Sequence, residues 1–326
     1  MMRQTIAAVL LLAGPVAASA QPATTKLEAV SGIPSLDSKT QTEDVRFKNG
    51  VDDRMTVPVR LSGAGPFRFL VDTGADRTSV SREVAGMLGL AQGQKAAIHT
   101  VSGVSTVSTA TLAALELTSK PVKIQDAPLL DSVNMGADGI IGVDALRSQS
   151  VLFDFQKQLL SIVPSSVAAF RDEPDVIVVS ASRKNGRLIV TDAVANGHNL
   201  TVVVDTGAQV SIGNEALRQQ LVGRGLVDPA QKVQLESVTG GIIAGDYMFV
   251  RELDIGGVTL RNLAIVFADA HTFKELKLDH TPALLLGMNA MRAFKKVSID
   301  FANRKFRVVL PETSELDVRL ANARLR

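Results

Sequence analysis

Two aspartates in the sequence, Asp72 and Asp205, stand in the same local setting. Each one ends an apolar run and is followed by Thr-Gly-Ala. A carboxylate at the mouth of a buried strand needs hydrogen-bonding partners; Thr supplies a hydroxyl group and Gly permits close backbone approach. If the two settings face each other, the carboxylates share one proton, because two close carboxylates cannot both ionise. Such a pair can take a proton from a water molecule and donate one to a carbonyl oxygen.

These two settings belong to a longer repeat. Asp72 and Asp205 lie 133 residues apart, and the same offset relates the turn-like residues 61–65 to 194–198. Further matches follow in the same order: helical patterns at 81–90 and 214–226, Gly-tipped turns at 100–104 and 237–241, apolar-Gly steps within 137–148 and 283–293, and strand-like runs at 151–155 and 297–301. The offset grows to 145 at the apolar-Gly steps, mostly through an insertion near 269–282. The chain is therefore predicted to be a tandem duplication of a mainly β unit.

At these residues the sequence resembles the retropepsin-like (retroviral-type) aspartic proteases, in a bacterial single-chain form with two Asp-Thr-Gly-Ala repeats. The resemblance rests on residues 72–75 and 205–208 and on the apolar-apolar-Gly steps at 140–142 and 285–287, and it covers about residues 45–310. It implies a mainly β fold with two tandem β-barrel lobes that form an intramolecular pseudo-dimer, each lobe carrying one or two short helices. It also implies an aspartic-type endopeptidase that needs no metal and no cofactor.

Carried over position by position, the resemblance makes Asp72 and Asp205 the catalytic pair. It assigns the support of the two loops to the remaining members of the motifs: Thr73, Gly74, Ala75, Thr206, Gly207 and Ala208. The threonines would lock the loops to each other, and the glycines would let substrate backbone pass closely. The flap that closes over bound peptide would be formed by the turns around Gly103, Gly240 and Gly241.

The sequence departs from the family at one ion pair that supports the active-site loops. The family often has an Arg after the apolar-Gly step, paired with an acid just after Asp-Thr-Gly-Ala. Here Val143 and Met288 occupy that place, and Asp76 follows the first motif whereas Gln209 follows the second. The ion pair is therefore expected to be absent or rebuilt.

The N-terminus resembles an export signal. One cation is followed by an apolar run at 6–12 and then by Ala18-Ser19-Ala20, which is the order of a secretory signal peptide. We expect cleavage after Ala20, no stable membrane span afterwards, and a periplasmic or secreted protein; an uncleaved anchor is the alternative. The predicted organisation is a signal peptide (1–20), a flexible lead-in (21–44), an N-terminal lobe (45–163), a linker (164–174), a C-terminal lobe (175–310) and a tail (311–326).

Composition narrows the possible partners. The absence of Cys excludes disulfides, Cys-ligated zinc and a cysteine nucleophile. Lys plus Arg is 35 and Asp plus Glu is 33, and a net charge of +2 gives no reason to expect nucleic acid.

For a protease, a polypeptide in extended conformation is the expected substrate, bound by strand-like hydrogen bonds. Because both motifs lie in one chain, we expect a monomer.

Other interpretations stay open at this point. A catalytically inactive periplasmic binding or scaffold protein on the same fold is the main alternative, and a two-repeat β protein for cell-wall peptide or sugar is another. Tyr247 is expected to be a half-buried strand residue rather than a substrate contact. His271 and His280 are expected in a surface loop rather than a metal site, and neither His99 nor His198 has the context of a nucleophile.

Overall fold

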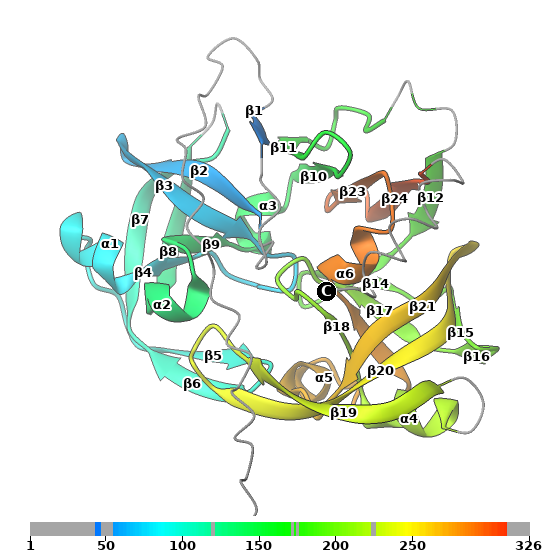
Figure 1. Ribbon diagram of the computed structural model, residues 1–326. Helices are drawn as coiled ribbons and strands as arrows, with labels where there is room; N and C mark the ends of the chain where they lie inside the picture. Colours follow the sequence, from blue (N-terminus) through cyan, green and yellow to red (C-terminus); the bar gives the residue numbers. More distant parts are fainter. Residues whose placement is uncertain are drawn as a thin grey trace, which may run out of the picture.

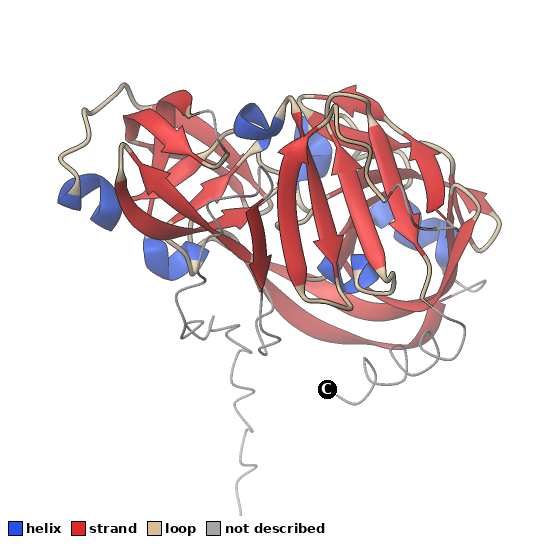
Figure 2. Ribbon diagram, turned by 90° about the horizontal axis from the view of Figure 1, so that it is seen from above, coloured by secondary structure: helices blue, strands red, loops and turns tan. Residues whose placement is uncertain are grey.

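The structure is a computed structural model that describes residues 43–46, 55–118, 121–170, 173, 176–222 and 226–311. The predicted signal peptide (1–20), nearly all of the lead-in and all but the first residue of the tail lie outside the described residues. In the described part of the chain, no helix has the length and apolar character needed to cross a membrane. Strands predominate and divide into two lobes (Figure 1, Figure 2), which confirms the predicted fold class.

The N-terminal lobe is a closed barrel with a separate hairpin beside it. The barrel order is β2 (Thr56–Leu61), β3 (Ala64–Val71), β9 (Gly139–Ile141), β4 (Ser79–Ser81), β8 (Val122–Leu130) and β7 (Thr109–Glu116). The hairpin consists of β5 (Ala96–Thr100) and β6 (Gly103–Val107) and forms a two-stranded sheet of its own. The short helices of this lobe are α1 (Arg82–Met87), α2 (Ser132–Met135) and α3 (Val143–Leu146).

The C-terminal lobe contains a ten-stranded sheet. Its main path runs β13 (Ser182–Lys184), β14 (Arg187–Val190), β17 (Thr201–Val204), β22 (Ala283–Leu286), β18 (Ser211–Gly213), β21 (Val258–Phe267), β20 (Ile242–Ile255), β15 (Ala193–Ala195) and β16 (His198–Asn199), and β19 (Leu226–Glu236) pairs with β20. The helices are α4 (Glu215–Leu221), α5 (His271–Glu275) and α6 (Met288–Met291).

The sheet of the second lobe is not a closed ladder like the barrel of the first lobe. Its two ends, β13–β14 and β15–β16, are consecutive in the chain and are joined by residues 191 and 192. The single strand β2 of the first lobe corresponds here to β14 and β15, and β3 corresponds to β16 and β17. The two repeats therefore differ in the leading hairpin: both of its strands are continuous in the first repeat and interrupted in the second.

Local signals explain the common parts of the lobes. The leading hairpins turn at Ser62-Gly63 and Asn196-Gly197, and both pairs have positive φ angles (49° and 83°, 46° and 83°), as a tight two-residue hairpin turn requires. The predicted helices after each Asp-Thr-Gly motif are α1 and α4. The Ser81 side chain accepts a hydrogen bond from the amide of Val84 at the start of α1, and Asn214 caps α4 in the same way.

A six-stranded sheet joins the lobes. Its order is β1 (Glu43–Arg46), β11 (Leu159–Pro164), β10 (Gln149–Asp154), β23 (Lys296–Asp300), β24 (Lys305–Val309) and β12 (Val176–Ser180). The two matched runs of the repeat, 151–155 and 297–301, supply its central pair, in which Val151 lies opposite Ile299 and Phe153 opposite Val297. One cluster of buried side chains includes Phe69 and Phe153 of the first lobe and Phe294 of the second. The repeats therefore form one pseudo-symmetric body.

Candidate active site

The two Asp-Thr-Gly loops lie against each other at the junction of the lobes. Each loop follows a buried strand, β3 or β17, that runs parallel to the strand of the apolar-Gly step, β9 or β22. The amide of Asp72 donates to the carbonyl oxygen of Ile141 at 3.0 Å, and the amide of Asp205 donates to that of Leu286 at 3.1 Å. The apolar-Gly strands thus fix the backbone of both aspartates.

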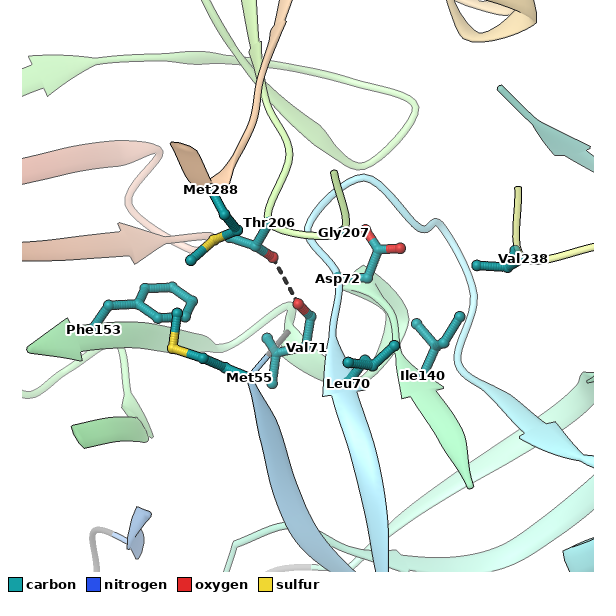
Figure 3. Close-up of a pocket in the computed structure, with 10 residues that line it drawn as sticks. All are labelled: Met55, Leu70, Val71, Asp72, Ile140, Phe153, Thr206, Gly207, Val238 and Met288. Carbon is teal, nitrogen blue, oxygen red and sulfur yellow. Dashed lines mark hydrogen bonds between the residues drawn. The ribbon is translucent and has the colours of Figure 1, made fainter. Parts of the chain in front are cut away.

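Thr73 and Thr206 lock the loops to each other through reciprocal hydrogen bonds. The amide of Thr73 donates to Thr206 Oγ1, and the amide of Thr206 donates to Thr73 Oγ1, both at 3.0 Å. Each hydroxyl group then donates across the pseudo-twofold axis. Thr73 donates to the carbonyl oxygen of Val204 at 2.9 Å. Thr206 donates to that of Val71 at 2.7 Å, the bond drawn in Figure 3. Both threonines are buried, so these bonds are protected from water.

Gly74 and Gly207 bring each loop close to the aspartate of the other. A Cβ atom on Gly74 would lie 2.5 Å from Asp205 Oδ1, and one on Gly207 would collide with the Asp72 carboxyl group in the same way. Each glycine also donates its amide within its own loop, Gly74 to Asp72 Oδ1 at 2.8 Å and Gly207 to Asp205 Oδ1 at 2.9 Å. The structure therefore requires glycine here for the approach of the opposite carboxylate, a reason that the sequence did not reveal.

The two carboxyl groups differ in their surroundings. Asp205 is buried whereas Asp72 is half-buried. Burial raises the pKa of Asp205; the positive charge of Arg187, the amides of Gly207 and Ala208, and a hydrogen bond with the Asp72 side chain oppose that rise. A hydrogen bond between two carboxyl groups needs a proton on one of them. The pair is thus suited to share one proton and to titrate as a unit.

Arg187 on β14 connects the C-terminal lobe to the first loop. Its buried guanidinium group donates from Nε to the carbonyl oxygen of Gly74 at 2.6 Å. Its Nη1 atom lies 2.8 Å from Glu275 Oε2 on α5 and 3.4 Å from Asp76 Oδ1. Burial raises the pKa of Asp76, and Arg187 opposes that effect. The ion pair expected to be absent or rebuilt is therefore rebuilt, with an arginine from the other lobe.

The sequence analysis missed two side chains, one in each repeat, that hydrogen-bond to the segment after the Asp-Thr-Gly loop. Asp144 Oδ1 accepts from the amide and the hydroxyl group of Thr78 at 2.9 and 2.6 Å. In the second repeat, Asn289 Oδ1 accepts from the amide and the hydroxyl group of Ser211, both at 2.8 Å. The repeat itself carried the signal, because Asp144 and Asn289 both stand two residues after the glycine of the apolar-Gly step.

The predicted flap glycines lie at the tips of two hairpins that meet. Gly103 and Gly240 have φ angles of 134° and 78°, which favour glycine. The hydroxyl group of Ser102 in the first hairpin donates to Ser237 Oγ in the second at 2.8 Å. A Cβ atom on Gly241 would collide with the Ser102 side chain, so this glycine permits the close contact of the tips. Their role as flaps stays a prediction.

Apolar side chains line a small pocket around the first aspartate. Leu70 and Ile140 from the N-terminal lobe and Val238 from the second hairpin lie on one side of Asp72, as Figure 3 shows. Val238 packs against the cluster that contains Leu70 and Ile140. The hairpin of one repeat thus reaches an apolar pocket of the other.

Tyr247 and three of the histidines, to which the sequence analysis gave no role in the site, are all located in the structure. Tyr247 on β20 is half-buried, as expected, and burial raises its pKa. His280 is exposed in a loop. The assignment of His271 to a surface loop is wrong: it is the first residue of α5, and its ring contacts His99 of the other lobe. Phe273 on α5 is buried and anchors this helix within the insertion. The polar composition of residues 269–282 gave no sign of the helix in the sequence.

Two protein families match the chain in tandem, one over each lobe. The family described as "gag-polyprotein putative aspartyl protease" matches residues 57–148, and the family described as "Aspartyl protease" matches residues 191–290. No curated protein matches the chain.

A mainly β chain whose two lobes bring Asp-Thr-Gly loops face to face has the architecture of an aspartyl protease pseudo-dimer. The two tandem matches, which together span more than half of the chain, agree with that architecture. The chain belongs to the retropepsin-like (retroviral-type) family of aspartyl proteases.

Proposed function

We propose that this protein is an exported aspartic endopeptidase whose catalytic residues are Asp72 and Asp205. The observation that carries the proposal is the approach of the two carboxyl groups, each packed against the glycine of the opposite loop. Reciprocal threonine bonds hold the loops in that geometry without any contribution from a second chain. Such rigid support is what a catalytic pair needs.

The chemistry follows from one proton shared by two carboxyl groups. The ionised carboxylate takes a proton from a water molecule, whose oxygen attacks the carbonyl carbon of the scissile peptide bond. The protonated carboxyl group donates its proton to the carbonyl oxygen, which gives a tetrahedral intermediate. When the carbon–nitrogen bond breaks, the first aspartate gives its proton to the leaving nitrogen. The carbonyl group re-forms as a hydroxyl group of the intermediate returns its proton to the second aspartate. The reaction consumes one water molecule and needs no covalent enzyme intermediate.

The substrate of this proposal is a polypeptide in extended conformation. The hairpins that carry Ser102 and Ser237 meet between the lobes and supply strand edges for backbone hydrogen bonds. Leu70, Ile140 and Val238 give the neighbourhood of Asp72 an apolar lining, which favours apolar side chains next to the scissile bond. Removal of residues 1–20 belongs to the same proposal, and N-terminal sequencing of the mature protein should begin at Gln21.

Proteolysis by single variants tests the proposed activity. Asp72→Asn and Asp205→Asn should each abolish peptide cleavage while circular dichroism remains that of the wild type, because one carboxyl group cannot be both base and acid. Asp192→Asn, which removes the same charge at an exposed position, is the matched control and should cleave normally. A statine-type peptide should inhibit the wild type.

The opposite results have definite meanings. Cleavage that survives in either aspartate variant would refute the catalytic assignment. Peptide binding without cleavage by the wild type would instead support the non-enzymatic binding or scaffold alternative on the same fold.

A further inference from the structure

The first hairpin, β5–β6, is attached to the molecule differently from the second. Its strands pair only with each other and form a separate two-stranded sheet. A two-stranded hairpin is marginally stable by itself in water, so its position depends on side-chain contacts. In contrast, β20 of the second hairpin runs on for 14 residues and pairs with β21 and β15 inside the large sheet. The first hairpin is therefore the one that can move as a unit.

A histidine pair links this hairpin to the opposite lobe. His99 Nδ1 on β5 lies 2.9 Å from His271 Nε2, the first residue of α5. The two rings stack with a centroid distance of 5.1 Å and an interplanar angle of 17°. The amide of His271 also donates to the carbonyl oxygen of Val101 at 2.9 Å. Figure 1 shows α5 beside the hairpin, so the insertion of the second repeat holds the flap candidate of the first.

This link depends on the protonation of both rings. A neutral imidazole has one donor and one acceptor nitrogen, so two neutral rings form one hydrogen bond. A first proton preserves the bond, since a charged ring donates to a neutral one. A second proton removes the last acceptor and places two positive charges side by side, which repel each other.

We propose that His99 and His271 form a pH-sensitive latch, which holds the β5–β6 hairpin against α5 of the opposite lobe and releases it when both rings are protonated. Histidine is the side chain whose charge changes between about pH 5 and 8, so the latch should open on the acid side of neutral pH. The latch itself is independent of proteolysis; only its consequence, access of a polypeptide to the paired aspartates, rests on the proposed function.

Five of the titratable groups around the pair have ion-pair partners. The titratable groups on the elements packed around it and on their flanking residues are Lys95, Lys123, Asp126, Asp269, Lys274, Glu275, Lys277, Asp279 and His280. Lys274 pairs with Asp269 at 2.8 Å, Glu275 with Arg187 at 2.8 Å, and His280 with Asp279 at 3.2 Å. Strand β6 carries no titratable side chain. The two imidazoles are thus the groups whose charge changes at the contact itself.

Distance measurements between spin labels test the latch directly. The chain has no native cysteine, so Thr106→Cys on β6 and Gln220→Cys on α4, both exposed, would carry the only labels. The distance distribution should be narrow at pH 7.5 and should broaden toward longer distances at pH 5. The same change should occur in the Asp72→Asn background. The result therefore does not depend on whether the protein is a protease.

Histidine variants provide the decisive comparison. His271→Gln and, independently, His99→Gln cannot titrate, so each should give the same distribution at both pH values. His280→Gln, in the same insertion but paired with Asp279, should keep the response of the wild type. Two results would overturn the latch: a wild-type distribution that is unchanged between pH 7.5 and 5, or a pH response that persists in both the His99 and the His271 variants.

Discussion

Arg187 in the C-terminal lobe donates a hydrogen bond to the carbonyl oxygen of Gly74 in the N-terminal lobe, across the axis that relates the repeats. The same guanidinium group is paired with Glu275 on α5. Glu275 belongs to the insertion of the second repeat, so the first repeat has no residue equivalent to this acid. Among the described residues, the two candidate catalytic carboxyl groups therefore have unequal surroundings, although the loops that carry them are nearly symmetric.

Replacing Arg187 should alter both stability and pH dependence. Arg187→Met leaves Glu275 without its buried cation and should lower the free energy of unfolding by about 3–5 kcal/mol in a denaturant titration. Because Arg187 lowers the pKa of Asp205, its loss raises that pKa, and the kcat/KM profile should move to higher pH. Arg187→Lys keeps the charge and is the control; its profile should stay closer to that of the wild type. An unmoved profile in a folded, active Arg187→Met variant would contradict the electrostatic role.

Removing one threonine hydroxyl group should destabilise the junction of the lobes. Thr73→Ala leaves the amide of Thr206 and the carbonyl oxygen of Val204 without their partners, which should cost about 2–4 kcal/mol of unfolding free energy. Thr206→Ala should have a similar effect because its bonds are the same by pseudo-symmetry. Thr73→Ser retains the hydroxyl group and should lose much less. Equal stability of the Ala and Ser variants would show that the hydroxyl bonds contribute little.

The buried carboxyl group of Asp205 should destabilise the folded protein at neutral pH. Its pKa is raised in the folded state by burial, so the folded protein holds this proton more tightly than the unfolded chain. Its contribution to stability is therefore greatest below the unfolded pKa of about 4 and falls as pH rises through the folded pKa. Asp205→Asn removes the ionisation, and its Tm at pH 7.5 should exceed that of the wild type, with a smaller difference near pH 4. A lower Tm at pH 7.5 would contradict this prediction.

Activity per milligram should not depend on protein concentration. Both aspartates lie in one chain, and the central sheet pairs β10 of one lobe with β23 of the other. Dilution from micromolar to nanomolar should therefore leave the specific activity of the wild type unchanged, as expected for a monomer. A steep loss of activity on dilution would indicate that the repeats pair between chains.

Much of the fold and of the candidate site could be predicted because the signals are local and occur twice. The repeat that contains Asp72 and Asp205 also contains the leading hairpins, the two helices and the matched strands of the central sheet. Buried-strand periodicity and turn residues such as Asn196-Gly197 act over a few residues, so a single sequence displays them. Asp144 and Asn289 also occupy equivalent positions, two residues after the glycine of each apolar-Gly step, so a comparison of the two repeats there would have found them.

What the sequence determined by itself was the duplication and the pairing of its two Asp-Thr-Gly motifs, because both motifs stand at equivalent positions of the repeat. The role of the threonines followed from the resemblance to the retropepsin-like family. Tertiary structure alone decided which further side chains meet across the lobes. Arg187 contacts a loop 113 residues away, and His99 reaches His271 over 172 residues. Neither contact lies within one strand or helix. No periodicity marks such pairs, because their proximity results from how two finished lobes pack.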